Sequence, residues 1–204
     1  EIFDAELKNH DSGYEYLVKK QILRRLRDIL LYHKENIGGL SVKSCEKVFN
    51  LTLDGVKFTG RADRIDLRSD GNGRNNHIVV DYKTGSTTKT PNLKKFNLED
   101  RYAWPKTLKS VQLPLYVMFY MAESPKIALQ AVDACLMLLG SHKITEEFLF
   151  DKSEDKAADL ARLRKAVFCL VCEIRSAELD FEPAADIKTC EFCPFKIMCG
   201  RQWA

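Results

Sequence analysis

An acid and a lysine lie one residue apart at the end of an apolar stretch, in the segment VVDYKTGS at residues 79–86. Side chains alternate between the two faces of a β-strand, so Asp81 and Lys83 share one face while Tyr82 points to the other. A strand that ends in this way presents a carboxylate and an ammonium group together. The glycine that follows, Gly85, indicates that the chain leaves the sheet there.

A second acidic segment, GRADRID at residues 60–66, precedes the first one by a polar loop. If the two segments pair as neighbouring strands, a carboxylate of the earlier strand approaches Asp81. Alternation sends Asp63 and Asp66 to opposite faces, so only one of them faces Asp81 unless a bulge intervenes. Pairing alone leaves the choice between the two acids open.

Two carboxylates beside a lysine suit a hard divalent cation, because Mg²⁺ and Mn²⁺ prefer oxygen ligands and take further contacts from water and phosphate. Such a cation lowers the pKa of water and offsets charge on a phosphate, while an ammonium group stabilises the developing negative charge. This chemistry is phosphodiester hydrolysis. The alternative is a strand end whose acid and lysine form exposed ion pairs, which stabilise a protein little.

The acidic segments resemble the signature of the PD-(D/E)xK nuclease superfamily, and specifically of the RecB/AddB-type nuclease domain. The resemblance lies in G-x-x-D at Gly60 to Asp63 and in acid-x-Lys at Asp81 to Lys83. It implies that Asp63 and Asp81 are metal ligands, that Lys83 is the catalytic lysine, and that the main-chain carbonyl of Tyr82 is a further ligand. It therefore favours Asp63 over Asp66. Glu46 is a further acid that could lie in an outer shell.

The segment QLPLY at residues 112–116 resembles the Q-x-x-x-Y motif of the same subfamily. Residues four apart share a helix face, so the amide of Gln112 and the phenol of Tyr116 can point together at the metal site or at the DNA. By itself, this spacing is more typical of two polar residues on a core helix. Together with the acid-x-Lys motif, the resemblance implies that Gln112 and Tyr116 are catalytic residues.

Three cysteines, Cys190, Cys193 and Cys199, form a C-x2-C-x5-C pattern near the end of the chain. Thiolates at such spacing bind zinc or an iron–sulfur cluster. In the AddB-like branch, the resemblance implies a [4Fe–4S] cluster whose first cysteine lies far upstream, outside this sequence. The cluster would then be incomplete here, and we expect residues 186–204 to be a cysteine-rich tail that binds a metal or cluster.

The elements that must position these residues follow from sequence periodicity. We expect an amphipathic helix from Tyr14 to about Tyr32 and a final helical face over residues 160–174. Strand patterns cover residues 47–53, 56–67, 78–83, 132–139 and 145–150, with an Asp-Gly hairpin at residues 54–55. Residues 84–106 read as a long polar loop, and residues 108–122 as a buried helix. The first three strands form an antiparallel meander.

With this order of elements, the resemblance implies an α/β fold with a restriction-endonuclease-like core, in which helices flank a mixed central sheet. Residues 1–204 would form one nuclease domain. Because the sequence begins with Glu1 rather than Met, we expect it to be a piece of a longer protein. The resemblance implies a Mg²⁺- or Mn²⁺-dependent deoxyribonuclease, an exonuclease of a recombinational-repair helicase–nuclease. Its partners would be DNA and a helicase domain or subunit. The alternative is a non-catalytic DNA-binding or scaffolding module with the same fold.

Composition sets broad limits on these expectations. The 204 residues can bury one sizeable core, and a net charge of +3 does not by itself indicate nucleic-acid binding. Basic residues are grouped, however, on one side of the first helix and in the loop, as Lys89, Lys94, Lys95 and Lys106. Seven cysteines, an odd number, favour a reducing compartment, and we expect a cytoplasmic protein without a membrane span.

Overall fold

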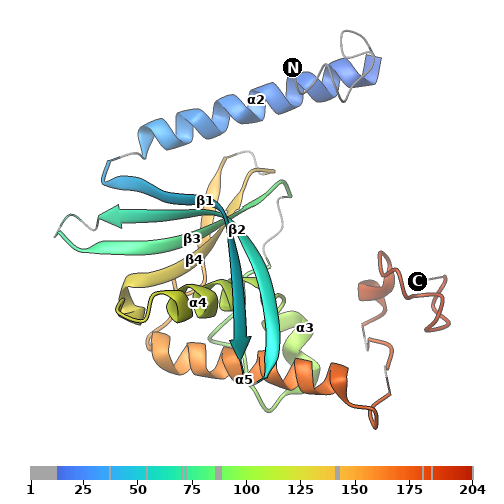
Figure 1. The fold of residues 1–204 in the computed structure, drawn as a ribbon. Coiled ribbons are helices and arrows are strands. Elements are labelled where there is room, and N and C mark those ends of the chain that lie inside the picture. The colour runs from blue at the N-terminus through green and yellow to red at the C-terminus, as the bar shows by residue number, and fades with distance from the viewer. Residues whose placement is uncertain are drawn as a thin grey trace.

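A computed structural model describes residues 13–203 except 37, 54, 70, 72, 86–88, 141–142, 181 and 185. The elements follow one another as α2 (Gly13–Glu35), β1 (Leu40–Leu53), β2 (Val56–Ser69), β3 (Asn75–Lys83), η1 (Arg101–Ala103), α3 (Trp104–Thr107), α4 (Gln112–Glu123), η2 (Leu129–Ala131), β4 (Val132–Leu138), β5 (Thr145–Phe148), α5 (Lys156–Arg175) and η3 (Ile187–Cys190). Helices lie on both sides of the sheet (Figure 1).

The sheet has five strands in the order β1-β2-β3-β4-β5. β1, β2 and β3 pair antiparallel, as the meander predicts, and β4 pairs antiparallel with β5. β3 and β4 run parallel, and the crossover between them contains α3 and α4. This mixed sheet with flanking helices is an α/β restriction-endonuclease-like fold, and the predicted fold class is confirmed.

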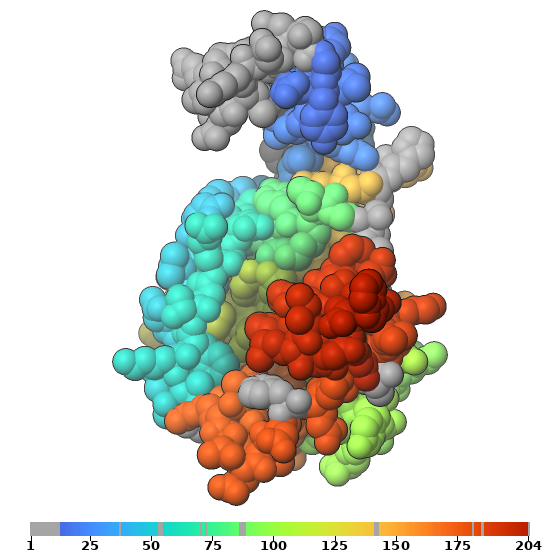
Figure 2. Space-filling view, turned by 90° about the vertical axis from the view of Figure 1, so that its right-hand side faces the viewer, coloured from blue at the N-terminus to red at the C-terminus, as the bar shows by residue number. Residues whose placement is uncertain are grey.

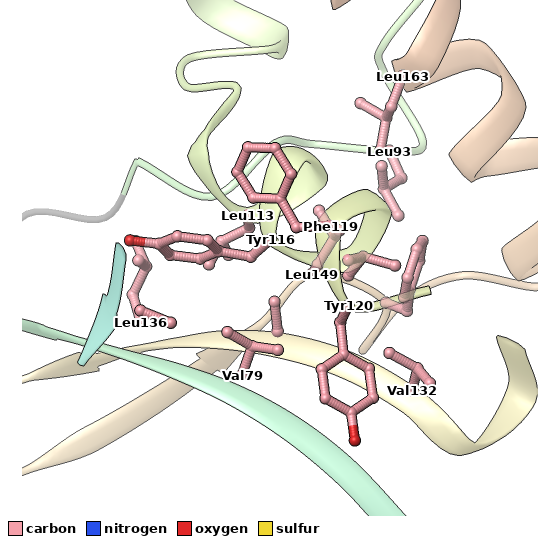
Figure 3. Close-up of a cluster of buried hydrophobic side chains, with 14 of the residues drawn as sticks. Val79, Leu93, Leu113, Tyr116, Phe119, Tyr120, Val132, Leu136, Leu149 and Leu163 are labelled. Atoms are coloured by element: carbon pink, nitrogen blue, oxygen red, sulfur yellow. The ribbon is translucent and has the colours of Figure 1, made fainter. Parts of the chain in front are cut away.

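The core lies mainly between the sheet and the helices α4 and α5. Figure 3 shows side chains of α4 and α5 packed over strand residues such as Val79, Val132 and Leu136. β4 reads VDACLML and every residue in it is buried, which is expected for a central strand covered on both faces. A smaller cluster on the opposite face contains Ile78, Val80, Cys135 and Met137.

The first helix differs from its prediction in burial. Its length exceeds the predicted range only slightly, but none of the residues of α2 is buried. Leu26 and Leu30, on the apolar side of this amphipathic helix, are 49% and 70% exposed. Tyr32, near the end of the helix, packs on the smaller cluster. Figure 1 shows α2 as a separate rod above the strands, with its N-terminal part extending past the sheet.

The helix predicted over residues 108–122 begins later, at Gln112. Lys109 has a φ of 56°, a left-handed conformation that breaks a continuous helix after α3. With this start, Pro114 falls in the first turn, where a missing N–H costs no helical hydrogen bond. The segment predicted as a long polar loop contains η1 and α3 and is partly core, since Leu93, Phe96 and Trp104 are buried in it. No helix within the described residues is long and apolar enough to cross a membrane.

The cysteine-rich tail follows α5 after an extended segment, and Figure 1 shows it to one side of the sheet and helices. Figure 2 shows it as a lobe on the surface of the molecule. Large apolar side chains of this lobe are exposed, including Phe192 at 89% and Met198 at 85%. The tail therefore contributes little to the main core.

Candidate active site

Asp81 and Lys83 lie at the end of β3 and meet on one face of the sheet, as alternation predicts. Asp81 is buried, at 5% exposure, while the Lys83 side chain is 35% exposed. The Nζ atom of Lys83 lies 2.5 Å from Oδ2 of Asp81 in an ion pair that lacks hydrogen-bond geometry. A buried carboxylate oxygen therefore has a cation as its partner.

The other carboxylate oxygen of Asp81 faces the first turns of α4. Nε2 of Gln112 donates a hydrogen bond to Oδ1 of Asp81 at 2.7 Å and another to the Tyr116 hydroxyl at 2.9 Å. That hydroxyl lies 3.0 Å from the same Oδ1 and 2.8 Å from the main-chain oxygen of Arg61, so one proton serves two acceptors. The structure thus brings Gln112 and Tyr116 together at Asp81.

Tyr116 stays a neutral hydrogen-bond donor. Burial, together with the nearby charge of Asp81, raises the pKa of Tyr116 well above the ordinary value for a phenol, although the hydrogen bond from Gln112 acts in the opposite direction. Figure 3 shows the ring of Tyr116 within the core and its hydroxyl pointing out of the apolar cluster. The residue therefore joins the core to the polar site.

Asp63 approaches the same strand end from β2. Its Oδ2 accepts a hydrogen bond from the main-chain N–H of Tyr82 at 2.7 Å. Asp66 lies instead on the opposite face of the sheet, fully buried against Arg64 and Arg68. Of the two acids that pairing left open, Asp63 is the one that contacts the segment between Asp81 and Lys83.

An irregularity in the meander accounts for the direction of Asp63. Ala62 and Ile65 both pack in the α4-side cluster, although a regular strand would send residues three apart to opposite faces. Asp63 lies opposite Glu46 of β1, because the neighbouring pairs are Cys45 with Arg64 and Lys47 with Ala62. Glu46 has a φ of 51°, a left-handed conformation. The regular alternation of side chains between the two faces of β2 is therefore broken between Ala62 and Ile65. The Glu46 carboxylate pairs with exposed Arg61, 3.2 Å away.

The segment after Lys83 rests on Gly140, a residue that the sequence pattern did not single out. The N–H of Leu139 donates to the Lys83 carbonyl at 2.8 Å, and the N–H of Gly140 donates to the Gly85 carbonyl at 3.3 Å. A Cβ atom at Gly140 would lie 2.6 Å from the carbonyl carbon of Gly85. Only glycine fits this close approach, whereas Gly85 itself has open space around it.

The donor set fits a hard divalent cation in its chemistry. Asp63, Asp81 and the carbonyl of Tyr82 are oxygen donors, and Oδ2 of Asp81 is buried without a hydrogen bond. Within the described residues, however, no group of three or more His, Cys, Asp or Glu side chains is close enough to hold a metal ion. Two carboxylates leave several positions for water and phosphate oxygens, as is usual for Mg²⁺.

The cysteines of the tail differ in burial. Cys190 is buried, Cys193 is half-buried and Cys199 is exposed. The N–H of Cys193 donates to the carbonyl of Cys190 in a turn, at 3.1 Å, and a guanidinium N–H of Arg201 lies 3.4 Å from the Cys190 sulfur. Within the part of the chain that the structure describes, no three cysteines lie close enough together to hold a metal.

The sequence matches the model of a known protein family. The family model described as the PD-(D/E)XK nuclease superfamily matches residues 1–200. A solved structure titled "Crystal structure of SSO0001" is similar over 95% of this chain and 79% of its own, with 18% identity and a TM-score of 0.36. No curated protein matches the sequence. Since the family model spans nearly the whole sequence, the chain belongs to the PD-(D/E)XK nuclease superfamily.

Proposed function

We propose that the protein is a metal-dependent deoxyribonuclease of the RecB/AddB type, acting as an exonuclease within a helicase–nuclease of recombinational repair. Membership of the superfamily suggests a nuclease. The observation that carries the proposal is the set of partners around the buried carboxylate of Asp81, which are Lys83, Gln112 and Tyr116. An isolated surface ion pair would not recruit an amide and a phenol from a separate helix.

Each residue has a role in this proposal. Asp63, Asp81 and the carbonyl of Tyr82 would hold Mg²⁺ or Mn²⁺, which when bound activates water and offsets charge on the phosphate. Lys83 stabilises negative charge that develops on the phosphate, and its partial exposure leaves the ammonium accessible to DNA. Gln112 and Tyr116 fix the orientation of Asp81 by hydrogen bonds to Oδ1, so that Oδ2, which pairs with Lys83, is the oxygen that would face the metal ion.

Exposed lysines support binding to the phosphate backbone. Lys89, Lys94, Lys95 and Lys106 are exposed on the segment that begins just after Lys83. Buried side chains of the same segment pack it against the core, so the backbone that bears these lysines is anchored. Contacts of this kind bind DNA without regard to sequence, and they weaken as salt concentration rises.

The tail belongs to the same proposal. We place residues 1–204 in a single nuclease domain with residues 186–204 as a cluster-binding tail, in which Cys190, Cys193 and Cys199 would supply three of the four ligands of a [4Fe–4S] cluster. Iron and sulfide analysis of anaerobically purified longer protein tests this assignment, and stoichiometric zinc would contradict it. The odd number of cysteines supports a reducing compartment, the cytoplasm. A helicase domain or subunit would be the partner.

The test is degradation of linear single- and double-stranded DNA with Mg²⁺ or Mn²⁺. We expect Asp81→Asn and Lys83→Ala to lower kcat by about 10²-fold or more, because the first removes a carboxylate ligand of the cation and the second removes the ammonium that stabilises charge on the phosphate. Lys126→Ala, at an exposed lysine in the turn after α4, is the matched control and should match the wild type. Equal degradation by all four proteins would refute the site. DNA binding without degradation, in a longer protein that contains its cluster, would instead favour the non-catalytic binding module.

A further inference from the structure

A network of buried charges lies on the face of the sheet away from α4, behind the candidate active site. At its centre Asp66 is 0% exposed, and Arg64 is 8% exposed. Nε of Arg64 lies 2.8 Å from Oδ1 of Asp66, and Nη2 donates to Oδ2 at 2.9 Å. Arg68 donates to the same carboxylate at 2.9 Å and to Glu146 at 2.6 Å. Replacing a buried ion pair by apolar residues is often neutral or stabilising, so stability alone does not explain this network.

The third guanidinium nitrogen of Arg64, Nη1, faces β3, the strand that contains Asp81 and Lys83. Its Nη1 donates to the hydroxyl of Tyr82 at 2.7 Å and lies 3.1 Å from Nε2 of His33 in α2. Burial, together with the charge of Arg64, lowers the pKa of His33, so the ring is neutral and its Nε2 can accept this hydrogen bond. The planar guanidinium thus spans from Asp66 to Tyr82, and Tyr82 is the residue between Asp81 and Lys83.

The strand pairing explains why this contact matters for the site. The last pair between β2 and β3 is Arg64 with Val80, whereas β3 remains paired with β4 up to Lys83 with Leu138. Beyond Val80, the end of β3 is therefore held on its β2 side by side chains of β2 and not by main-chain strand pairing. The carboxylate of Asp63 takes the main-chain N–H of Tyr82, and the guanidinium of Arg64 takes the phenol of Tyr82. Both contacts hold Tyr82, which lies between the proposed catalytic residues Asp81 and Lys83.

We propose that Arg64 is a positioning residue, which fixes Asp81 and Lys83 relative to Asp63 by holding the Tyr82 side chain from the far face of the sheet. This inference rests on the proposed function. The contact does not touch DNA or the reacting phosphate. Its loss should therefore change the turnover number and the binding of the cation while leaving the binding of DNA unaffected.

Tyr82→Phe is the most specific perturbation, because it removes the phenol oxygen and leaves the pair of Arg64 with Asp66 in place. Arg64→Lys is the second variant. A single ammonium cannot span from Asp66 to Tyr82 as the guanidinium does. Tyr14→Phe is the matched control, since the Tyr14 side chain is 76% exposed and the chemical change is the same.

Three readouts are needed: steady-state kinetics on linear DNA, Mn²⁺ binding followed by the electron paramagnetic resonance signal of free Mn²⁺, and Tm. We expect Tyr82→Phe to lower kcat by about tenfold, as for loss of one charge-assisted hydrogen bond. The Kd for Mn²⁺ should rise several-fold and KM for DNA should not change. The double variant Arg64→Lys with Tyr82→Phe should be no worse than Arg64→Lys alone, because both changes break one contact.

Two results would overturn the inference while the nuclease assignment stands. One is an active wild type in which Tyr82→Phe matches Tyr14→Phe in kcat and in Mn²⁺ affinity. The other is a loss of activity that follows the loss of folded protein, with the Kd for Mn²⁺ unchanged, which would show a purely structural contact. A wild type that neither cleaves DNA nor binds Mn²⁺ would refute the proposed function, and the role of Arg64 with it.

Discussion

Replacing Gly140 by alanine is expected to displace the chain that follows the candidate catalytic lysine. A Cβ atom at position 140 would lie 2.6 Å from the carbonyl carbon of Gly85 and 2.7 Å from its oxygen, and it would be closer still to the carbonyl oxygen of Thr84. All three are main-chain atoms, so no side-chain rotation can relieve the contact.

The size of the effect follows from this geometry. To restore an ordinary contact of 3.4 Å, the backbone after Lys83 must move by about 1 Å. Overpacking of this kind costs about 1–3 kcal/mol in the free energy of unfolding. A misplacement of about 1 Å at reacting groups costs about 10²-fold in rate. Because Leu139 also bonds the Lys83 carbonyl, the displacement reaches the lysine directly.

The assay compares Gly140→Ala with Gly38→Ala, a glycine with nothing within 4 Å of its Cβ position. Denaturant unfolding gives the change in stability, and kcat on linear DNA at a temperature where both variants are folded gives the change in rate. Gly38→Ala should resemble the wild type. A Gly140→Ala protein with the stability and kcat of Gly38→Ala would refute the argument that this close approach positions Lys83.

Two further predictions concern other parts of the fold. Burial raises the pKa of Asp133 to about 6, against about 4 when unfolded, so its protonation favours the folded state. As pH rises from 4 to 7, the free energy of unfolding of the wild type should fall by up to about 3 kcal/mol relative to that of Asp133→Asn, measured by denaturant unfolding. Parallel pH profiles of the two proteins would contradict this. The side chain of Asp155 accepts hydrogen bonds from Ala157 and Ala158 at the start of α5. Asp155→Ala should therefore lower the free energy of unfolding by about 1 kcal/mol, and an unchanged Tm would contradict the cap assignment.

The sequence predicts four of the five strands and the antiparallel meander closely, because alternation is a local signal, but it misses residues 40–46, the first half of β1, which precede the expected start at residue 47. For the first helix, local signals are not enough, since an amphipathic pattern predicts a helix but does not predict which part of the protein covers its apolar side. Leu26 and Leu30 illustrate this limit, because both lie on the apolar side of α2 and are 49% and 70% exposed.

At the candidate site, the shared face of Asp81 and Lys83 follows from alternation, and four-residue spacing places Gln112 beside Tyr116. The selection of Asp63 over Asp66 needs the change of side next to Ala62, which no period-two pattern contains. The role of Gly140 depends on the parallel pairing of β3 with β4, and sequence periodicity does not give the register of strands so distant along the chain.

The irregularity at Glu46 also affects how the sheet meets other chains. β1 is an edge strand of fourteen residues, and a long, flat edge with free N–H and C=O groups invites pairing with a strand of another molecule. Here the register shifts between Val42 and Ser44, and Glu46 adopts a left-handed conformation with its charged side chain exposed. β5, at the other edge, has only four residues. The distortion that turns Asp63 toward Tyr82 thus also protects the longer edge from aggregation.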